Sequence, residues 1–340
     1  MNILMLSKYF YPHIGGVEKH VEKICGILLK NGHKVTVVTE NFDNKQKINE
    51  INSSGVKIER FSYPKVKILG IIFLWINIFK YRDIIKKADV IHCHDVFIWY
   101  LPFRFLFPFK HVYTTFHGYE GYPIKKSAII IRKISELLSN GNICVGDFIR
   151  KWYGTKPSIV TYGATDLIKA RESKHFKYDA IFVGRLDEQT NIIEYLSVVK
   201  RLTDKLNKFE LLVLGDGKYL KEARDIADCK GFVKDPEKYY SEAKYAFVSR
   251  YLSILEAFIS RKLVFAIYDN EVKEDYLKMA PYAKWIVIEK SSEQLTERLL
   301  YFGTHQMEAD KMIENAYTWA RNQTWNNMVN NYIKLWGLKT

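Results

Sequence analysis

Residues 2–39 read NILMLSKYFYPHIGGVEKHVEKICGILLKNGHKVTVVT, and this stretch decides the fold. The apolar run over 2–7 predicts a buried strand, and the β-branched residues over 34–39 predict another. Between them apolar residues recur on one face of a helix, which Asn31-Gly32 ends as a left-handed cap would. The stretch is therefore predicted to be a βαβ unit. The apolar helical positions are Val17, Val21, Ile24, Cys25, Leu28 and Leu29.

Strand and helix patterns alternate along the rest of the chain, which predicts an α/β fold with mostly parallel sheets. The chain has 340 residues, more than one core of about 250 to 300 residues accommodates. We expect a Rossmann-like domain over 1–162, a polar hinge over 163–177, a second Rossmann-like domain over 178–318 and a C-terminal helix within 319–340. Further strands are expected at 56–61, 90–94, 111–115, 143–145, 158–162, 178–183, 209–214, 231–233, 245–249, 263–267 and 285–288.

The last helix is amphipathic and needs a partner surface, because its apolar face carries two tryptophans. Its apolar positions are Trp325, Met328, Val329, Tyr332, Ile333 and Trp336.

The charge and the cysteine content narrow the range of expected binding partners and cellular compartments. Lysine and arginine number 52 against 38 aspartates and glutamates, and the net charge of +14 predicts attraction to nucleic acid, nucleoside diphosphates or anionic lipid. The four cysteines form no CxxC pair, which argues against structural zinc and a disulfide framework and favours a reducing cytoplasm. The first six residues read as a buried strand and not as a secretion signal.

Residues 68–79 read ILGIIFLWINIF, well short of the ~20 residues that span a bilayer. Residues 97–110 (FIWYLPFRFLFPFK) add further aromatic and basic side chains. Both segments are interpreted in two ways: as buried helices that pack on the sheet, or as a surface that holds the N-terminal domain on an anionic membrane. The basic residues that flank the first segment are Lys65, Lys67, Lys80, Arg82, Lys86 and Lys87.

In open α/β sheets ligands bind beyond the carboxyl ends of the strands. Gly15 and Gly16 follow the first strand at a helix start, where free N–H groups and the helix dipole favour a phosphate. A simple tight turn is the alternative, and the pattern is not the GxGxxG of dinucleotide-binding domains.

Histidines follow the next strands. His92 and His94 share one face of the strand at 90–94, which indicates packing and not a metal site, because the sequence offers no evident third ligand. His117 follows the strand at 111–115, where its imidazole either hydrogen-bonds a donor sugar or phosphate or serves the structure alone.

The second half repeats this arrangement. Arg185 directly follows a strand and suits bidentate phosphate recognition, with a surface ion pair as the alternative. Gly215 and Gly217 form a glycine turn after another strand. Glu256 is expected at the start of an apolar helix, where a carboxylate also simply favours the helix dipole.

Taken together and in this order, these pieces resemble glycosyltransferase family 4, whose fold is GT-B. The likeness runs nearly end to end. It rests on the segments YFYPHIGGVEKHV, NGHKVTVVT, DVIHCHD, TTFHG, GRL, LGDG, GFV and LEAF.

The resemblance implies two Rossmann-like, doubly wound domains with an interdomain cleft and a C-terminal helix that crosses back to the first domain. It implies a retaining, metal-independent hexosyltransferase-like enzyme without a cofactor, which uses a nucleotide-diphosphate sugar and a glycan or lipid-linked acceptor. By matching position, His117 would contact the transferred sugar. The donor-binding residues would be Gly15, Gly16 and Arg185 at the diphosphate, Phe232 and Val233 at the base, and Glu256 at the ribose.

The donor half departs from the family pattern. The family usually has a lysine five residues after the GRL arginine, where this chain has Thr190, and the first glutamate of its Glu-x7-Glu pair has no counterpart here. Arg250 or Arg261 is a candidate to replace the lost positive charge. A catalytically weakened GT-B protein that binds a glycan or a partner is therefore the second hypothesis.

Two other functions fit less well. Nucleic-acid binding rests on the charge alone, and a sugar-nucleotide epimerase fits the GRL and LEA pattern less well than a transferase does. No nucleic acid is expected as a partner. We expect a cytoplasmic protein, with peripheral attachment to the inner face of the cell membrane as an additional prediction.

Overall fold

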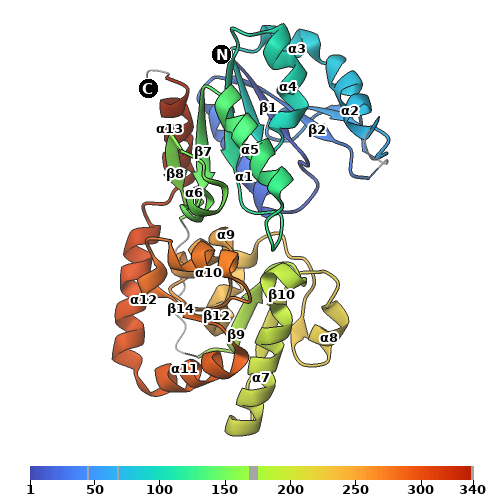
Figure 1. Cartoon of the computed structure of the whole chain (residues 1–340). Helices are drawn as coiled ribbons and strands as arrows, with labels where there is room; N and C mark the ends of the chain where they lie inside the picture. Colours follow the sequence, from blue (N-terminus) through green and yellow to red (C-terminus); the bar gives the residue numbers. More distant parts are fainter. Residues whose placement is uncertain (44–45, 67–68, 168–174, 338–340) are drawn as a thin grey trace. The chain divides into compact units, whose positions relative to one another are not determined.

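The computed structural model describes residues 1–43, 46–66, 69–167 and 175–337. The chain divides into two compact units: unit 1 comprises Met1–Thr161 with Trp325–Thr340, and unit 2 comprises Tyr162–Thr324 (Figure 1). Lys67 and Ile68 of the apolar segment, 168–174 of the expected hinge, and the last three residues lie outside the described ranges.

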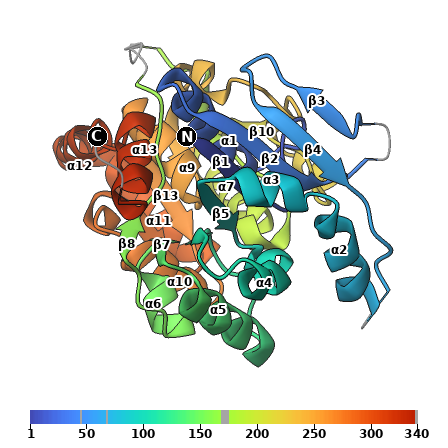
Figure 2. The ribbon, with the colours of Figure 1, turned by 90° about the horizontal axis from the view of Figure 1, so that it is seen from above.

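Unit 1 is built on an eight-stranded sheet in the order β3-β4-β2-β1-β5-β6-β7-β8. All neighbours are parallel except β3 and β4, which pair antiparallel (Figure 2). The strands are β1 Asn2–Ser7, β2 Lys34–Glu40, β3 Asn49–Ile51, β4 Lys57–Phe61, β5 Val90–His94, β6 His111–Phe116, β7 Gly141–Val145 and β8 Ile159–Thr161. The helices are α1 Gly16–Lys30, α2 Leu69–Phe79, α3 Arg82–Lys87, α4 Phe97–Leu106, α5 Lys126–Leu138, α6 Phe148–Tyr153 and α13 Trp325–Leu335.

The predicted βαβ unit at the N-terminus is confirmed. β1 pairs in parallel with β2, and Asn2 lies opposite Lys34. Helix α1 connects them and buries the face that the apolar spacing indicated. One polar side chain, His20, is buried on that face.

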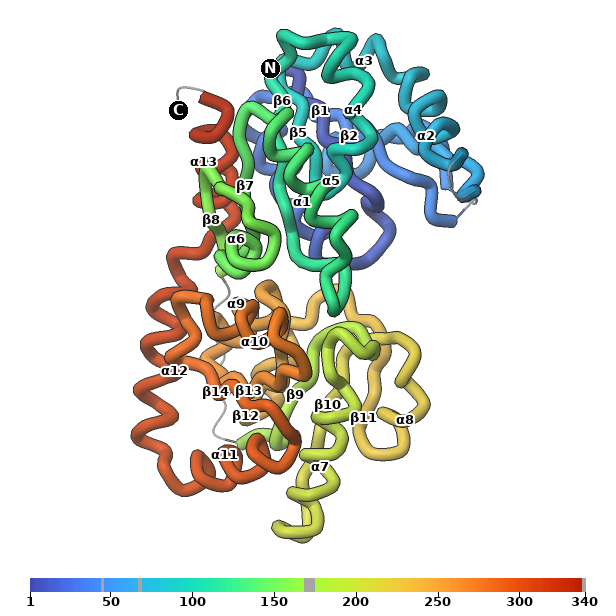
Figure 3. Tube along the Cα trace, viewed as in Figure 1, coloured from blue at the N-terminus to red at the C-terminus, as the bar shows by residue number. Residues whose placement is uncertain are grey.

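Helix α13 belongs to unit 1 although it follows unit 2 in the sequence. It packs beside α1 and β8, and the tube in Figure 3 shows its dark red trace beside the green trace of β8. The apolar face identified in the sequence is buried there, so both tryptophans are covered. Its buried residues include Trp325, Met328, Val329, Tyr332 and Ile333.

Helix α2 is covered on one face only. Leu74 and Ile78 join a core cluster with residues of α4, and the indole N–H of Trp75 donates to the carbonyl of Ile98 over 2.8 Å. Several apolar side chains of α2 stay exposed, as do others around the end of α4. They are Leu69, Ile71, Ile72, Phe73, Ile76 and Phe79 on α2, and Phe105, Leu106 and Phe109 near the end of α4.

Unit 2 is built on a six-stranded, all-parallel sheet in the order β11-β10-β9-β12-β13-β14. The two sheets confirm the predicted α/β class. The strands are β9 Tyr178–Val183, β10 Leu211–Leu214, β11 Asp228–Cys229, β12 Ala243–Phe247, β13 Leu263–Ile267 and β14 Val287–Glu289. The helices are η1 Glu188–Thr190, α7 Ile192–Leu206, α8 Leu220–Arg224, η2 Pro236–Lys238, η3 Tyr240–Glu242, α9 Tyr251–Ile259, α10 Glu271–Lys278, η4 Ala283–Trp285, α11 Ser292–Thr304 and α12 Gln306–Ala320.

Two strand predictions were wrong. The strand expected at 231–233 lies earlier, at β11, because Gly231 has a left-handed φ of 69° that ends the extended backbone. Strand β3 was missed because its three residues, Asn49–Ile51, lie at the sheet edge and include two of low β propensity. Within the described ranges, no helix combines the length and hydropathy needed to cross a bilayer.

Candidate functional site

The glycine turn after β1 forms the start of α1. Gly16 is the first helical residue, and Gly15 precedes it in an extended conformation. A Cβ at Gly15 would overlap the carboxylate of Glu18, and that carboxylate also lies 2.8 Å from Nδ1 of His13. A different Glu18 rotamer would relieve this overlap, so the contact does not by itself require a glycine at position 15. An acidic side chain thus lies at the helix end that was predicted to receive a phosphate.

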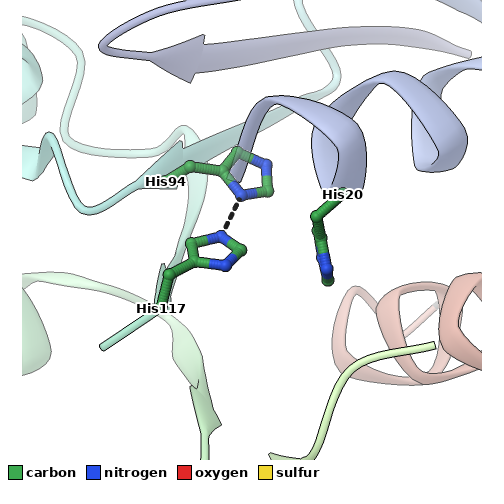
Figure 4. Close-up of side chains that lie close together, drawn as sticks. All are labelled: His20, His94 and His117. Carbon is green, nitrogen blue, oxygen red and sulfur yellow. Dashed lines mark hydrogen bonds between the residues drawn. The ribbon is translucent and has the colours of Figure 1, made fainter. Parts of the chain in front are cut away.

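Three histidines gather beyond the carboxyl ends of β5 and β6 (Figure 4). His94 ends β5, His117 follows β6, and His20 projects from α1. Nδ1 of His94 lies 2.9 Å from Nε2 of His117, and the His20 ring packs edge-on at a centroid distance of 4.7 Å from the His117 ring. The sequence offered no evident third ligand beside His92 and His94, whereas the structure brings His20 and His117, which are distant along the chain, next to His94.

Three imidazoles are a donor set that Zn²⁺ and related ions accept, and one nitrogen of each ring lies within 4.8 Å of the others. Two nitrogens on one Zn²⁺ ion, each at ~2.0–2.1 Å, can be at most about 4.2 Å apart. A separation of 4.8 Å is longer than this limit, so the rings would have to move closer together to share an ion. In this structure the rings instead hydrogen-bond to one another and to protein groups, while Nε2 of His94 is buried with no hydrogen-bond partner among the described residues.

The electrostatics of this cluster favour neutral rings. Burial lowers the pKa of His117 to about 3, and the charges of His92 and Arg132 act in the same direction. Burial is also the main cause that holds the pKa values of His20 and His94 well below the usual range. At neutral pH the cluster therefore offers hydrogen bonds and no positive charge.

A buried hydrogen-bond chain fixes the protonated nitrogens. The indole of Trp336 can only donate, so its 3.1 Å bond makes Nδ1 of His92 an acceptor and puts the proton of His92 on Nε2. Nε2 then donates to the hydroxyl of Thr115 over 2.7 Å. The hydroxyl of Tyr332 lies 3.0 Å from that of Thr115 and 2.8 Å from Nε2 of His20. If each hydroxyl donates its proton within the chain, Thr115 donates to Tyr332 and Tyr332 donates to Nε2 of His20. Nε2 of His20 is then an acceptor, so the ring proton of His20 lies on Nδ1.

Asp95 anchors the backbone of His117. The carboxylate oxygens of Asp95 lie 3.1 and 3.3 Å from the His117 N–H. Asp95 has a positive φ of 61°, which is uncommon outside glycine and suits the sharp turn after β5. Burial raises the pKa of Asp95 to about 6, while Arg132 and the His117 N–H act to lower it.

Arg132 holds the loop that follows His117. Its guanidinium donates to the carbonyl of Gly118 and to the carboxylate of Glu120, each over 2.9 Å. Tyr153 donates to the other oxygen of Glu120 over 2.5 Å. Sequence reasoning missed Arg132, His20 and Asp95 as site residues; for Asp95 the signal was its place directly after the strand, in DVIHCHD.

In unit 2, the loops after β9 and β10 are held together. The Gly184 N–H donates to the Leu214 carbonyl over 3.1 Å, and the Leu186 N–H donates to the Asp216 carbonyl over 2.9 Å. A Cβ at Gly215 would overlap the carbonyl oxygen of Gly184. The glycine turn is therefore a requirement of close backbone packing.

Arg185 and Thr190 belong to the same loop. Arg185 is largely exposed, and its Nε lies 3.3 Å from a carboxylate oxygen of Asp187. Thr190 is buried, and its hydroxyl lies 2.6 Å from the Arg185 carbonyl and 2.9 Å from the Asp187 carbonyl. The residue that stands in place of the expected lysine thus closes the turn that carries Arg185.

The remaining predicted donor residues lie on two elements of unit 2. Phe232 is exposed and Val233 half-buried, just after Gly231, whose carbonyl accepts from the Gly215 N–H over 2.8 Å. Glu256 is buried in the second turn of α9, so its expected position at the helix start was wrong. A dipole role accounts poorly for a carboxylate there, because the dipole effect falls off within the first turn.

Comparisons with known proteins add two family matches. The family model described as Glycosyltransferase Family 4 matches residues 14–158, and the model described as Glycosyl transferases group 1 matches residues 165–319. Among curated relatives, a phosphatidylinositol N-acetylglucosaminyltransferase subunit from Homo sapiens is 42% identical over 57 residues. That match covers 17% of this chain and only 12% of the human protein.

Solved structures match over the whole length at low sequence identity. Sucrose-phosphate synthase from Thermosynechococcus elongatus is 14% identical, with a TM-score of 0.77 and 98% of both chains covered. Anabaena Alr3699/HepE, solved in complex with UDP, is 13% identical, with a TM-score of 0.75 and 98% of both chains covered. At these identities the likeness establishes the fold.

Proposed function

Because this chain belongs to the glycosyltransferases, with a family 4 domain followed by a group 1 domain, we propose that it transfers a sugar from a nucleotide-diphosphate sugar. The acceptor in this proposal is a glycan or a lipid-linked glycan. The reaction retains the anomeric configuration, requires no metal ion, and takes place in the cytoplasm.

The observation that carries the proposal is the arrangement around His117. Its backbone N–H is anchored by Asp95 and its ring is bonded to His94, so the imidazole is held rigidly just beyond β6. A neutral, preorganised imidazole can hydrogen-bond a sugar hydroxyl while the bond to the leaving diphosphate lengthens. In this proposal His117 contacts the transferred sugar, and the three-histidine cluster orients it without a metal.

Charge develops on the leaving diphosphate, and Arg185 is proposed to neutralise it in unit 2. Backbone N–H groups near Gly15 and Gly16 in unit 1 are proposed as phosphate donors in their own right. Losing one such donor typically costs ~2.7 to 4 kcal/mol of transition-state stabilisation. Because Glu18 lies beside Gly15, diphosphate binding there requires its carboxylate to swing away. We assign the base to the backbone at Phe232 and Val233, and the ribose to Glu256.

Exposed apolar side chains on α2 and around the end of α4 support a lipid-linked acceptor. A soluble domain rarely exposes so many large apolar residues on neighbouring helices. Two exposed basic residues lie nearby: Lys80 directly follows α2, and Arg82 begins α3. We propose that this surface rests on an anionic leaflet at the inner face of the cell membrane.

A glycan-binding or partner-binding protein with weakened catalysis is the second candidate. Thr190 favours it, because a buried hydroxyl stands where a phosphate-binding lysine is expected. The two candidates differ in turnover and not in fold.

The test combines a thermal-shift panel of nucleoside diphosphates and their sugars with an assay of donor hydrolysis and transfer. A ligand at ~100 times its Kd adds about 2.7 kcal/mol of stability, which such a panel detects. We expect His117→Ala to lower turnover by about a hundredfold and donor affinity far less. Dialysis against a chelator should leave turnover unchanged. Donor binding without any turnover would favour the binding protein, and loss of activity that divalent ions restore would refute the metal-free mechanism.

A further inference from the structure

Two guanidinium groups of unit 2 converge on one neutral side chain. Nη2 of Arg185 donates to Oε1 of Gln189 over 3.2 Å, and Nη2 of Arg250 donates to the same oxygen over 2.8 Å. The two nitrogens therefore lie at most about 6 Å apart. The acceptor that they share is a neutral amide oxygen, so each of these two contacts is a hydrogen bond and not an ion pair.

The strand order of the unit 2 sheet explains why Arg185 and Arg250, which are 65 positions apart in the chain, lie close together. Strand β9 is the central neighbour of both β10 and β12, and all three strands run parallel. Arg185 follows the carboxyl end of β9, and Arg250 follows β12 directly before α9. Both loops therefore lie beyond the carboxyl ends of the strands, where ligands of open α/β sheets bind.

A third basic residue, Lys273, contacts both of these loops. Nζ of Lys273, which is fully buried, donates to the carbonyl and the hydroxyl of Ser249 over 2.8 and 3.1 Å, and to the carbonyl of Gln189 over 3.3 Å. Arg250 also donates to that Gln189 carbonyl over 3.3 Å. Lys273 thus ties the loop after β12 to the loop after β9.

The charged groups around this place carry both signs. Burial and the charge of Arg250 lower the pKa of Lys273, while the carboxylates of Asp269 and Asp187 act to raise it. Asp187 contacts Arg185 at 3.3 Å on the exposed side of the loop. Two guanidinium groups held close together repel each other, and a bound anion would convert that repulsion into attraction.

We propose that Arg185 and Arg250 form a two-guanidinium cradle for the donor diphosphate, with Gln189 as the spacer between them. This proposal rests on the proposed nucleotide-sugar transferase function and extends it by one binding residue, Arg250. It assigns Arg250 as the replacement for the lysine whose place Thr190 takes. Guanidinium forks suit this role because they bind phosphate oxygens in pairs.

Arg261, the other candidate from the sequence, has a different environment. It forms an ion pair with Glu314, and its guanidinium lies 3.9 Å from the centre of the Tyr317 ring. It follows the opposite end of α9 from Arg250. Arg261 is therefore a matched control, an arginine beside the same helix whose contacts tie it to α12.

The experiment is titration calorimetry on the full chain with inorganic pyrophosphate and with a panel of nucleoside diphosphates, at low and high KCl. Arg250→Gln should weaken pyrophosphate and nucleoside diphosphates by about tenfold or more, as Arg185→Gln should, while Arg261→Gln stays within about twofold of the wild type. Arg250→Lys keeps the charge and removes the fork, so its loss should be smaller. The difference between wild type and Arg250→Gln should shrink as KCl rises.

The outcomes separate this proposal from the function on which it rests. If nucleoside diphosphates bind and Arg250→Gln matches Arg261→Gln, the cradle is wrong and the transferase function stands. If Arg250 is required for pyrophosphate but no sugar is transferred, the cradle stands and the transferase function fails. A wild type that binds neither pyrophosphate nor nucleotide refutes both. If Arg250→Gln does not fold, Arg250→Lys is the deciding variant. A pyrophosphate affinity of Arg250→Lys equal to that of the wild type would contradict paired binding of phosphate oxygens by the Arg250 guanidinium.

Discussion

The hydroxyl of Tyr332 in the last helix lies 2.8 Å from Nε2 of His20 in the first. This bond joins residues 312 positions apart and completes the buried chain through Thr115 and His92. The C-terminal helix therefore contributes a polar contact to the histidine cluster in addition to its apolar face.

Removing this hydroxyl should destabilise unit 1. Tyr332→Phe leaves Nε2 of His20 and the hydroxyl of Thr115 without this partner, and a buried polar group left unsatisfied costs about 1 to 3 kcal/mol. Chemical denaturation of wild type and variant measures the difference. Tyr100→Phe in the same unit is the control, because the buried Tyr100 hydroxyl has no hydrogen-bond partner among the described residues. Equal loss in both variants would show that the chain through Tyr332 contributes nothing specific.

Stability should fall in mild acid. The pKa values of His20, His92, His94 and His117 are lowered by burial, to about 3 for His92 and His117, so the unfolded chain binds more protons below pH ~6.5. The stability from the neutral rings is complete above pH ~6.5 and is lost as the pH falls toward 3. Each ring contributes a slope of about 1.4 kcal/mol per pH unit in that window.

Asp95 acts in the opposite direction over part of this range. Its pKa is raised to about 6, so its ionised form destabilises the fold above pH 6, and this penalty is relieved as the pH falls toward 3.8. Four histidines outweigh one carboxylate, so urea unfolding at closely spaced pH values should show stability falling below pH 6.5 and most steeply between about pH 5 and 4, and His92→Gln should flatten the curve. A variant curve parallel to that of the wild type would contradict the assignment of neutral rings.

Gly215→Ala should destabilise unit 2 by more than about 2 kcal/mol. The backbone φ of Gly215 is 157°, and an added Cβ would overlap the carbonyl oxygen of Gly184, so the loops after β9 and β10 would have to separate. Thermal unfolding measures the loss. Gly303→Ala on α11 of the same unit is the control, since its Cβ would meet no atom within 4 Å and should stabilise the helix by roughly 0.5 to 1 kcal/mol. A neutral Gly215→Ala would show that these loops are not packed as the structure describes.

The fold could largely be predicted from the sequence, because its signals are local. The periodicity of residues 2–39 predicts a strand, a helix and a strand without reference to distant residues. The exceptions are also local. Gly231 ends the strand although Phe232 and Val233, two residues of high β propensity, follow it, and the edge strand Asn49–Ile51 is too short and polar to be recognised.

The candidate site could be predicted only in part, because its contacts are long-range. His94 and His117 meet because β5 and β6 are neighbours in the sheet, and His20 joins them from α1. The sequence gives no distance between such residues. In the same way, Arg250 and Arg261 were equivalent candidates until the pairing of β9 with β12 brought only Arg250 close to Arg185.

The apolar surface of α2 and the end of α4 leads to a last prediction, on membrane attachment. Each exposed lysine or arginine near an anionic leaflet contributes about 1 kcal/mol, and apolar side chains add to it when they enter the headgroup region. Lys65 is a poor choice for substitution, because its ammonium forms a 2.7 Å ion pair with the buried carboxylate of Glu40. Lys80, directly after α2, and Arg82, the first residue of α3, are both exposed and are better targets.

We expect the wild type to sediment with anionic liposomes at low salt and much less with neutral liposomes or at high salt. Lys80→Glu with Arg82→Glu should reverse the local charge and leave most of the protein in the supernatant, as should Ile72→Ser with Ile76→Ser, which removes exposed apolar contacts. Lys200→Glu with Lys205→Glu, exposed on α7 of unit 2, changes the net charge equally and should sediment like the wild type. If this control loses binding as strongly, attraction depends on net charge alone. If the wild type stays in the supernatant, a water-soluble acceptor replaces the lipid-linked one.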